Sequence, residues 1–207
     1  VDQQALVAIP EGVSFVQAAT ATDAGMTSYS ALTKGGEIKQ GEKIGIIGLG
    51  GLGQIAARAA VLKGAEVHVA EINEKAWEMA EEIGVKEISK SILDFKDRGL
   101  TKIIDYAGFG QTTADAIETV VRDGSVVLVG MGKLEALIST IRMILSQVTL
   151  YGSNGGTKED VAAIMDLYQS GGLNPKLTTI GFEDIPHGID DLRAHRIVGR
   201  LVAEVAD

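Results

Sequence analysis

The sequence predicts an α/β fold in which six parallel strands form a doubly wound sheet with helices on both faces. Two features of the 207 residues carry this prediction. Segments typical of strands alternate with segments typical of helices, and the strand segments are continuous apolar runs, as in a sheet buried on both faces. The first strand also runs directly into a glycine-rich turn, KIGIIGLGGLG at Lys43–Gly53. In such a sheet, ligands bind at the carboxyl ends of the strands.

The other elements are expected in a regular order along the chain. Further strands are expected at Glu66–Ala70, Val85–Ile88, Lys102–Asp105, Ser125–Gly130 and Gln147–Gly152. Helices are expected at Leu52–Lys63, Asn73–Ile83, Thr112–Arg122, Ala136–Leu145 and Lys158–Ser170. Asn73 suits an N-cap and Gly84 a C-cap, while Thr157 and Asp160 have the spacing of a capping box.

Both ends of the chain depart from this rhythm. Val1–Phe15 is expected to form a strand and a turn, followed by a helical stretch at Val16–Thr33. Leu177–Val205 is expected to have strand-like ends around a helix near Ile189–Ala194. These terminal segments look like parts of a second structural layer.

The glycine-rich turn has the residue pattern that a dinucleotide site needs. Gly48, Gly50 and Gly53 form the sequence G-x-G-x-x-G. The first glycine permits a tight turn, the second lets a pyrophosphate approach the backbone, and the third lets the helix pack close to the sheet. Backbone N–H groups at Gly51 and Leu52 are expected to hold the pyrophosphate where the helix begins. A purely structural turn would share this glycine pattern, so the residues around the turn must distinguish the two interpretations.

The context supplies an acidic residue at the end of the next strand. Glu71 follows the apolar run Val67–Ala70, eighteen residues after Gly53. Its carboxylate can accept hydrogen bonds from a ribose diol and repels the additional phosphate of NADP, which predicts NAD as the cofactor. Lys75 is open to two interpretations, a contact with the adenosine ribose or a solvated surface charge.

Composition excludes several other classes of function. The net charge of −9 argues against a nucleic-acid or anionic-membrane surface. The apolar stretch Ile44–Leu62 contains glycines and charge, so we do not expect it to span a membrane. No secretion signal is visible at the start, which makes a cytoplasmic location the default expectation. The chain has no cysteine, which excludes thiolate catalysis and cysteine-based zinc sites within it. Its histidines, His68, His187 and His195, fit structural or exposed roles.

Several spaced motifs resemble the medium-chain dehydrogenase/reductase superfamily, most closely the zinc-type alcohol dehydrogenases. The matching segments lie in family order along nearly the whole chain. They are Ile9–Gly12, Ala18-Ala19, Asp23–Tyr29, Gly48–Gly53, Asp105–Gly108, Val129-Gly130, Gly152–Thr157 and Val198–Arg200.

The resemblance implies that a catalytic domain is missing. Similar family members begin with a GroES-like domain that supplies a cysteine, a histidine and a neighbouring glutamate to a catalytic zinc, and nothing in these residues matches it. We therefore expect residues 1–32 to be a remnant strand and connecting helix of the catalytic domain, residues 33–172 to be the NAD-binding domain, and residues 173–207 to be a segment returning to the catalytic domain.

The resemblance also implies roles for single residues. After the fourth strand, the segment Ala107-Gly108-Phe109 is expected to border the adenine and the nicotinamide ribose. The nicotinamide would be lined by Val129, Gly130, Met131, Ser153, Asn154 and Gly155. Arg200 stands where the family has an arginine on the cofactor phosphates, although a surface arginine is the alternative. Asp23 stands where many relatives have a cysteine as third zinc ligand, and it could bind zinc only in a full-length enzyme; otherwise it is an ordinary helix acid.

These expectations describe the NAD(H)-binding domain of an alcohol dehydrogenase-like oxidoreductase, which transfers hydride between a nicotinamide cofactor and an alcohol or carbonyl substrate. The chain alone is expected to contain no catalytic residue, to hold no zinc and to be inactive. Two alternatives stay open: the cofactor domain of a zinc-independent reductase of the quinone-oxidoreductase type, and a non-catalytic NAD(H)-binding module. Family dimers pair their sixth strands, so a homodimer through Gln147–Gly152 is expected.

Overall fold

The structure is a computed structural model that describes residues 2–205. Its main feature is one parallel sheet with the strand order β3-β2-β1-β4-β5-β6. The strands are β1 (Lys43–Ile47), β2 (Glu66–Ala70), β3 (Glu87–Ser89), β4 (Lys102–Asp105), β5 (Ser125–Leu128) and β6 (Thr149–Gly152). The predicted doubly wound sheet of six parallel strands is therefore confirmed.

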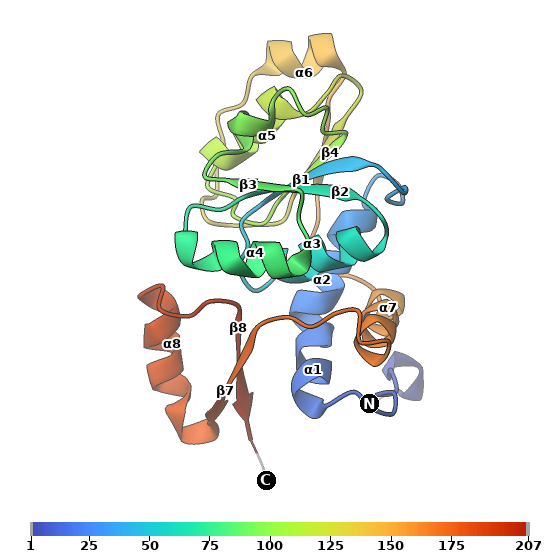
Figure 1. Cartoon of the computed structure of the whole chain (residues 1–207), viewed down its shortest axis with the longest axis vertical. Helices are drawn as coiled ribbons and strands as arrows, with labels where there is room; N and C mark the ends of the chain where they lie inside the picture. Colours follow the sequence, from blue (N-terminus) through green and yellow to red (C-terminus); the bar gives the residue numbers. More distant parts are fainter. Residues whose placement is uncertain (1, 206–207) are drawn as a thin grey trace.

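Helices cover both faces of the sheet (Figure 1). One face carries α2 (Met26–Thr33), α3 (Gly53–Leu62) and α4 (Trp77–Ile83), and the other carries α5 (Gln111–Thr119) and α6 (Thr140–Ser146). Neighbouring strand residues serve opposite layers, since Ile46 packs in the cluster with α3, whereas Ile47 packs in the cluster with α5. Burial on both faces explains why the strands are apolar runs.

The strand order creates a switch point between β1 and β4. The chain moves from β1 outward to β2 and β3, then returns to β4 on the other side of β1. Ile47 pairs with Ala70 on one side and with Asp105 on the other, so three strands end at the same level. In sheets of this topology, ligands bind outside the carboxyl ends of the strands at such a switch point.

The N-terminal segment corrects one prediction. Within the described part of residues 1–15 there is a 3₁₀ turn, η1 (Gln3–Ala5), and extended backbone, but no strand; Val1 lies outside the described residues. The apolar residues Val7 and Val13 pack on the cluster around α7 (Lys158–Gln169) instead of pairing in a sheet.

The predicted helix at 16–33 has three parts. It comprises α1 (Phe15–Thr20), a π-helical segment (Ala21–Gly25) and α2. Ser14 and Gln17 form a capping box at its start. The π-helical segment packs against α7, with Ala21, Ala24 and Ile164 in one buried cluster.

The C-terminal segment forms a small unit of its own. β7 (Leu177–Gly181) and β8 (Arg200–Glu204) pair in parallel, joined by a 3₁₀ turn, η5 (Phe182–Asp184), and α8 (Ile185–Arg193). The helix begins earlier than predicted, and Pro186 occupies its first turn, where a missing N–H costs nothing. Figure 1 shows this unit beside α1, at the same end of the molecule as both termini. Residues 206–207 lie outside the described residues.

Helix ends follow local capping. Gly84 ends α4 in a left-handed conformation, and the capping box of Thr157 and Asp160 opens α7, both as predicted. Asn73 caps a 3₁₀ turn, η3 (Glu74–Ala76), that leads into α4. The helix predicted from Ala136 begins only at Thr140, because Ser139 caps it. A 3₁₀ turn, η4 (Ile92–Phe95), completes the elements between β3 and β4.

Among the described residues, no helix combines the length and the apolar character needed to cross a membrane.

Candidate cofactor site

The glycine-rich turn joins β1 to α3 at the switch point. Gly48 adopts φ +89°, which favours glycine. A Cβ at Gly53 would lie 1.8 Å from the Gly48 carbonyl oxygen, so the helix begins in direct contact with the turn. A Cβ at Gly50 would meet no atom within 4 Å, and this part of the turn faces open space. The three glycines therefore lie as the sequence predicts: Gly48 in the tight turn, Gly50 facing open space and Gly53 where the helix packs close to the turn.

The start of α3 presents unpaired backbone donors. Within the described part of the chain, the N–H groups of Gly51 and Leu52 donate to no protein acceptor. The helix they precede has ten residues, and its N-terminus carries the positive end of the helix dipole. Open amides at such a terminus suit a phosphate.

Glu71 lies beside this turn, directly after β2. Its Oε2 accepts a hydrogen bond from the Leu49 N–H at 2.6 Å, and its Oε1 accepts one from the Asn73 N–H at 2.7 Å. These bonds fix the carboxylate across the turn. Each carboxylate oxygen has a second lone pair, so both can still accept from a ribose hydroxyl. Lys75 is exposed on η3, near this end of the site.

Arg200 reaches the turn from the C-terminal segment. A Cβ at Gly51 would lie 3.0 Å from Arg200 Cδ and 3.3 Å from its Nη1. The guanidinium therefore lies against the turn, where its fixed charge can meet a phosphate. Its Nη2 donates to Asp23 Oδ2 at 2.6 Å. The structure thus brings together two residues for which the sequence predicted separate roles.

The loops after β4 and β5 touch through their glycines. A Cβ at Gly108 would lie 1.9 Å from the Gly130 carbonyl oxygen, and one at Gly130 would lie 2.4 Å from the carbonyl carbon of Ala107. The N–H groups of Val129 and Gly130 both donate to the Asp105 carbonyl oxygen at 3.0 Å. Next along this rim, Met131 is 82% exposed.

The loop after β6 completes the rim. The Ser153 N–H donates to the Leu128 carbonyl oxygen at 3.0 Å, and Asn154 is exposed. The predicted cofactor residues therefore lie along the carboxyl edge of one sheet, apart from Lys75 on η3 and Arg200 on β8. Their individual roles toward a cofactor stay predictions.

Asp105 organises this edge, a role that sequence reasoning missed. It is fully buried at the end of β4. Its Oδ1 accepts from the N–H groups of Ala107 and Gly108 at 3.0 and 2.8 Å, and its Oδ2 accepts from the hydroxyls of Thr112 and Thr113 at 2.8 Å each. The carboxylate thus joins the loop to the first turn of α5. An acid at the end of an apolar strand, seven and eight residues before two threonines, was the available signal.

Tyr106 is a second residue whose role was missed. Its hydroxyl donates to the Ser28 carbonyl oxygen at 3.0 Å, and the Ser28 hydroxyl donates to the Leu52 carbonyl oxygen at 2.9 Å. Burial raises the pKa of Tyr106 above its ordinary value, so the hydroxyl stays protonated as a donor. These contacts fasten the glycine-rich turn to α2.

The described residues do not form a zinc site. No group of three or more histidine, cysteine, aspartate or glutamate side chains among them could hold a metal ion. Asp23 is paired with Arg200 and is 71% exposed. One carboxylate falls short of the three protein ligands of a catalytic zinc, so this donor set does not fit zinc.

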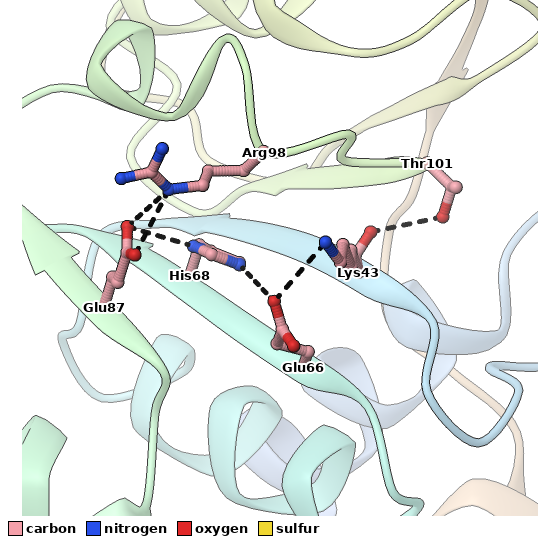
Figure 2. Close-up of polar contacts among 6 residues, drawn as sticks. All are labelled: Lys43, Glu66, His68, Glu87, Arg98 and Thr101. Atoms are coloured by element: carbon pink, nitrogen blue, oxygen red, sulfur yellow. Dashed lines mark hydrogen bonds and ion pairs between the residues drawn. The ribbon is translucent and has the colours of Figure 1, made fainter.

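A separate polar cluster lies toward the amino ends of the strands (Figure 2). The buried His68 places Nε2 3.3 Å from Glu66 Oε1 and Nδ1 3.7 Å from Glu87 Oε2. Arg98 Nε donates to both oxygens of Glu87, and this holds the pKa of Glu87 below its ordinary range. Lys43 Nζ lies 3.8 Å from Glu66 Oε1. The cluster links the first three strands at the end opposite to the glycine-rich turn, in keeping with a structural His68.

Comparison with known proteins identifies the family. The family model described as zinc-binding dehydrogenase matches residues 51–170. An alcohol dehydrogenase of Geobacillus stearothermophilus is 28% identical over 206 residues, which cover 96% of this chain and 60% of the relative.

Solved structures agree in fold. Acetophenone reductase from Geotrichum candidum, in complex with NAD, is 31% identical with a TM-score of 0.89, over 95% of this chain and 58% of that chain. CAD from Helicobacter pylori, complexed with NADP(H), is 26% identical with a TM-score of 0.81, over 95% and 57% of the two chains. The chain thus spans about three fifths of the length of the relatives it matches. The resemblance seen in the sequence is confirmed: this protein belongs to the zinc-binding dehydrogenase family, and its fold is that of the family's NAD(P)-binding domain.

Proposed function

We propose that this chain binds NAD(H) and orients it for hydride transfer between the nicotinamide and an alcohol or carbonyl substrate in a complete oxidoreductase. The observation that carries the proposal is the start of α3, where two open amides lie between the carboxylate of Glu71 and the guanidinium of Arg200. Bound there, the cofactor supplies the hydride chemistry. The chain's own residues bind the phosphates and the ribose and set their position.

We assign three parts of a dinucleotide to residues of this chain. The pyrophosphate is assigned to the amides of Gly51 and Leu52 with Arg200, and the adenosine ribose to Glu71. The nicotinamide end is assigned to the rim formed by the loops after β4, β5 and β6. Related structures hold NAD in one case and NADP(H) in another. In this chain we assign the choice between them to Glu71, the side chain proposed for the ribose.

We expect tighter binding of NAD(H) than of NADP(H) by at least ~1.4 kcal/mol, or about tenfold. The carboxylate of Glu71 accepts from the ribose diol and repels a 2′-phosphate. Glu71→Ala should remove this preference. Isothermal titration calorimetry with both cofactors measures it, and Glu78→Ala, an exposed carboxylate on α4, serves as a control. Equal affinities in the unmodified chain, or an unchanged preference in Glu71→Ala, would exclude this role for Glu71.

We further propose that residues 1–32 and 173–207 belong structurally to a catalytic domain outside this sequence. An apolar groove of about 1000 Å³ supports this, because the N-terminal segment, α1 and β8 line it together with the start of α7. Its lining includes Leu6, Ile9, Phe15, Val202 and Val205. Phe15 is 84% exposed there, as expected of a side chain that another domain covers.

We assign any zinc chemistry to that complete enzyme and not to this chain. Asp23 would add one ligand to ligands from the absent domain. The chain alone should hold no stoichiometric zinc and should not oxidise simple alcohols, which metal analysis and a dehydrogenase assay test. One tightly held zinc ion per chain, or turnover that a chelator abolishes, would contradict this expectation.

A zinc-independent reductase is the second candidate. The ion pair between Asp23 and Arg200 favours it, because a carboxylate bound to a guanidinium is not free to bind a cation. The zinc content of the complete protein distinguishes the two: stoichiometric zinc supports the dehydrogenase and its absence the reductase.

We propose a homodimer through β6. This strand is one edge of the sheet, and the Thr149 N–H points inward to the Gly124 carbonyl oxygen, so the alternate residues Leu150 and Gly152 direct their backbone groups outward. Exposed apolar side chains also occur on α6 and the loop before it, the segment that leads into β6: Leu134, Leu137, Ile141, Ile144 and Leu145. A second copy of the same surface would cover both features by two-fold symmetry.

Sedimentation equilibrium should find a dimer at micromolar concentration. A lysine at the strand edge should give a monomer, because pairing would then bring two like charges together. Leu150→Lys is one such variant, and Thr149→Lys is a cleaner one, since Leu150 packs on the core whereas Thr149 is exposed. A monomeric unmodified chain would contradict the dimer, and dimeric lysine variants would place the interface elsewhere.

A further inference from the structure

Asp23 and Arg200 form an ion pair beside the glycine-rich turn. Arg200 Nη2 donates to Asp23 Oδ2 at 2.6 Å, across 177 positions of sequence. The Arg200 side chain is 29% exposed and that of Asp23 is 71% exposed. The carboxylate of the pair is thus largely open to solvent, whereas the arginine side chain is mostly covered.

Both partners are fixed by the backbone around them. Asp23 lies in the π-helical segment, whose inner residues are buried against α7; a Cβ at Gly25 would lie 2.9 Å from Ile164 Cγ2. Arg200 begins β8, and its N–H donates to the Lys176 carbonyl oxygen at 2.9 Å. The two side chains therefore meet because of the fold, not by the chance contact of flexible segments.

The same arginine lies at the proposed phosphate position. A Cβ at Gly51 would lie 3.0 Å from its Cδ and 3.3 Å from its Nη1, so the side chain lies beside Gly51, whose N–H is one of the open amides at the start of α3. An anion held by these amides would be within reach of the guanidinium. Asp23 engages that guanidinium through a different nitrogen and compensates its charge.

We propose that Asp23 weakens cofactor binding by competing with the dinucleotide phosphates for Arg200. This inference rests on the proposed function. The pyrophosphate carries two negative charges, and without Asp23 they would meet an uncompensated guanidinium. With Asp23 present, the guanidinium must leave its partner or share its charge between the carboxylate and the phosphates. Asp23 thus sets the affinity of the chain for its cofactor through Arg200.

The test is a double-mutant cycle of NADH affinity, measured by titration calorimetry at low salt. Asp23→Asn should bind NADH roughly three- to tenfold more tightly than the unmodified chain, because a neutral amide leaves the charge of Arg200 uncompensated. Arg200→Gln should bind at least about tenfold more weakly. In the Arg200→Gln background, Asp23→Asn should produce no gain. Asp190→Asn, which changes the net charge equally at an exposed position on α8, should leave the affinity unchanged.

The outcomes separate this inference from the proposed function. Suppose that neither the unmodified chain nor any variant binds NADH, although circular dichroism shows that all are folded. The proposed function then fails, and the inference fails with it. If the unmodified chain binds but Asp23→Asn binds equally or more weakly, only the inference is overturned. A gain that persists in the Arg200→Gln background also overturns it, because Asp23 would then act by direct repulsion.

Discussion

Gly53→Ala should destabilise the fold by about 3 kcal/mol and abolish cofactor binding. In the first turn of an exposed helix, the same change would stabilise by up to ~1 kcal/mol, since alanine favours helix over glycine. Here a Cβ would lie 1.8 Å from the Gly48 carbonyl oxygen, which is backbone and cannot rotate away. Either α3 moves off the sheet or the turn opens, and both changes displace the amides at the phosphate position.

Gly50→Ala is the matched control for this result. A Cβ there meets no atom within 4 Å, and Gly50 is not among the residues with positive φ. Its free energy of unfolding should change by less than ~0.5 kcal/mol. Its affinity for NADH should nevertheless fall, because the methyl group occupies the space proposed for the pyrophosphate. Urea unfolding followed by circular dichroism, with titration of NADH, measures both effects. Equal stability of the two variants would show that α3 can relax around the added methyl group.

The order of elements was predictable because it depends on local patterns. Strands buried on both faces are apolar runs, and the turn between β1 and α3 needs glycines for reasons confined to six residues. The acid at the end of β2 could be found by counting along the chain. The sequence therefore locates the carboxyl edge of the sheet and the residues in its first two loops.

Contacts between distant segments were not predictable in this way. The ion pair between Asp23 and Arg200 depends on how the C-terminal unit packs against the π-helical segment. Tyr106 and Ser28 meet only after α2 has packed beside β4. The strand predicted near the N-terminus fails for the same reason, since Val7 and Val13 have the apolar character of a strand but pack on α7. A strand also needs a neighbouring strand, which no local pattern guarantees.

Asp105→Ala should destabilise the fold by about 4 kcal/mol. The buried carboxylate accepts four hydrogen bonds, from two backbone N–H groups and two threonine hydroxyls. Hydrogen bonds to a charged group contribute about 1.5–3 kcal/mol each, and burying the charge offsets part of their sum. Without the carboxylate, the buried donors of Gly108 and Thr113 lose their acceptor. The loop after β4 should then loosen, together with the rim proposed for the nicotinamide.

Asp105→Asn tests whether the charge or the shape of this side chain matters. The amide oxygen can keep both backbone N–H bonds, while the threonine hydroxyls must turn to accept from the amide N–H₂. Its loss should therefore be smaller, about 1–2 kcal/mol. Urea unfolding of both variants gives the comparison, with Asp166→Ala, an exposed aspartate on α7, as the control that should change by less than ~0.5 kcal/mol. If Asp105→Ala were as stable as Asp166→Ala, the loop and α5 would be held by packing alone, and the carboxylate would not be what fixes this edge of the sheet.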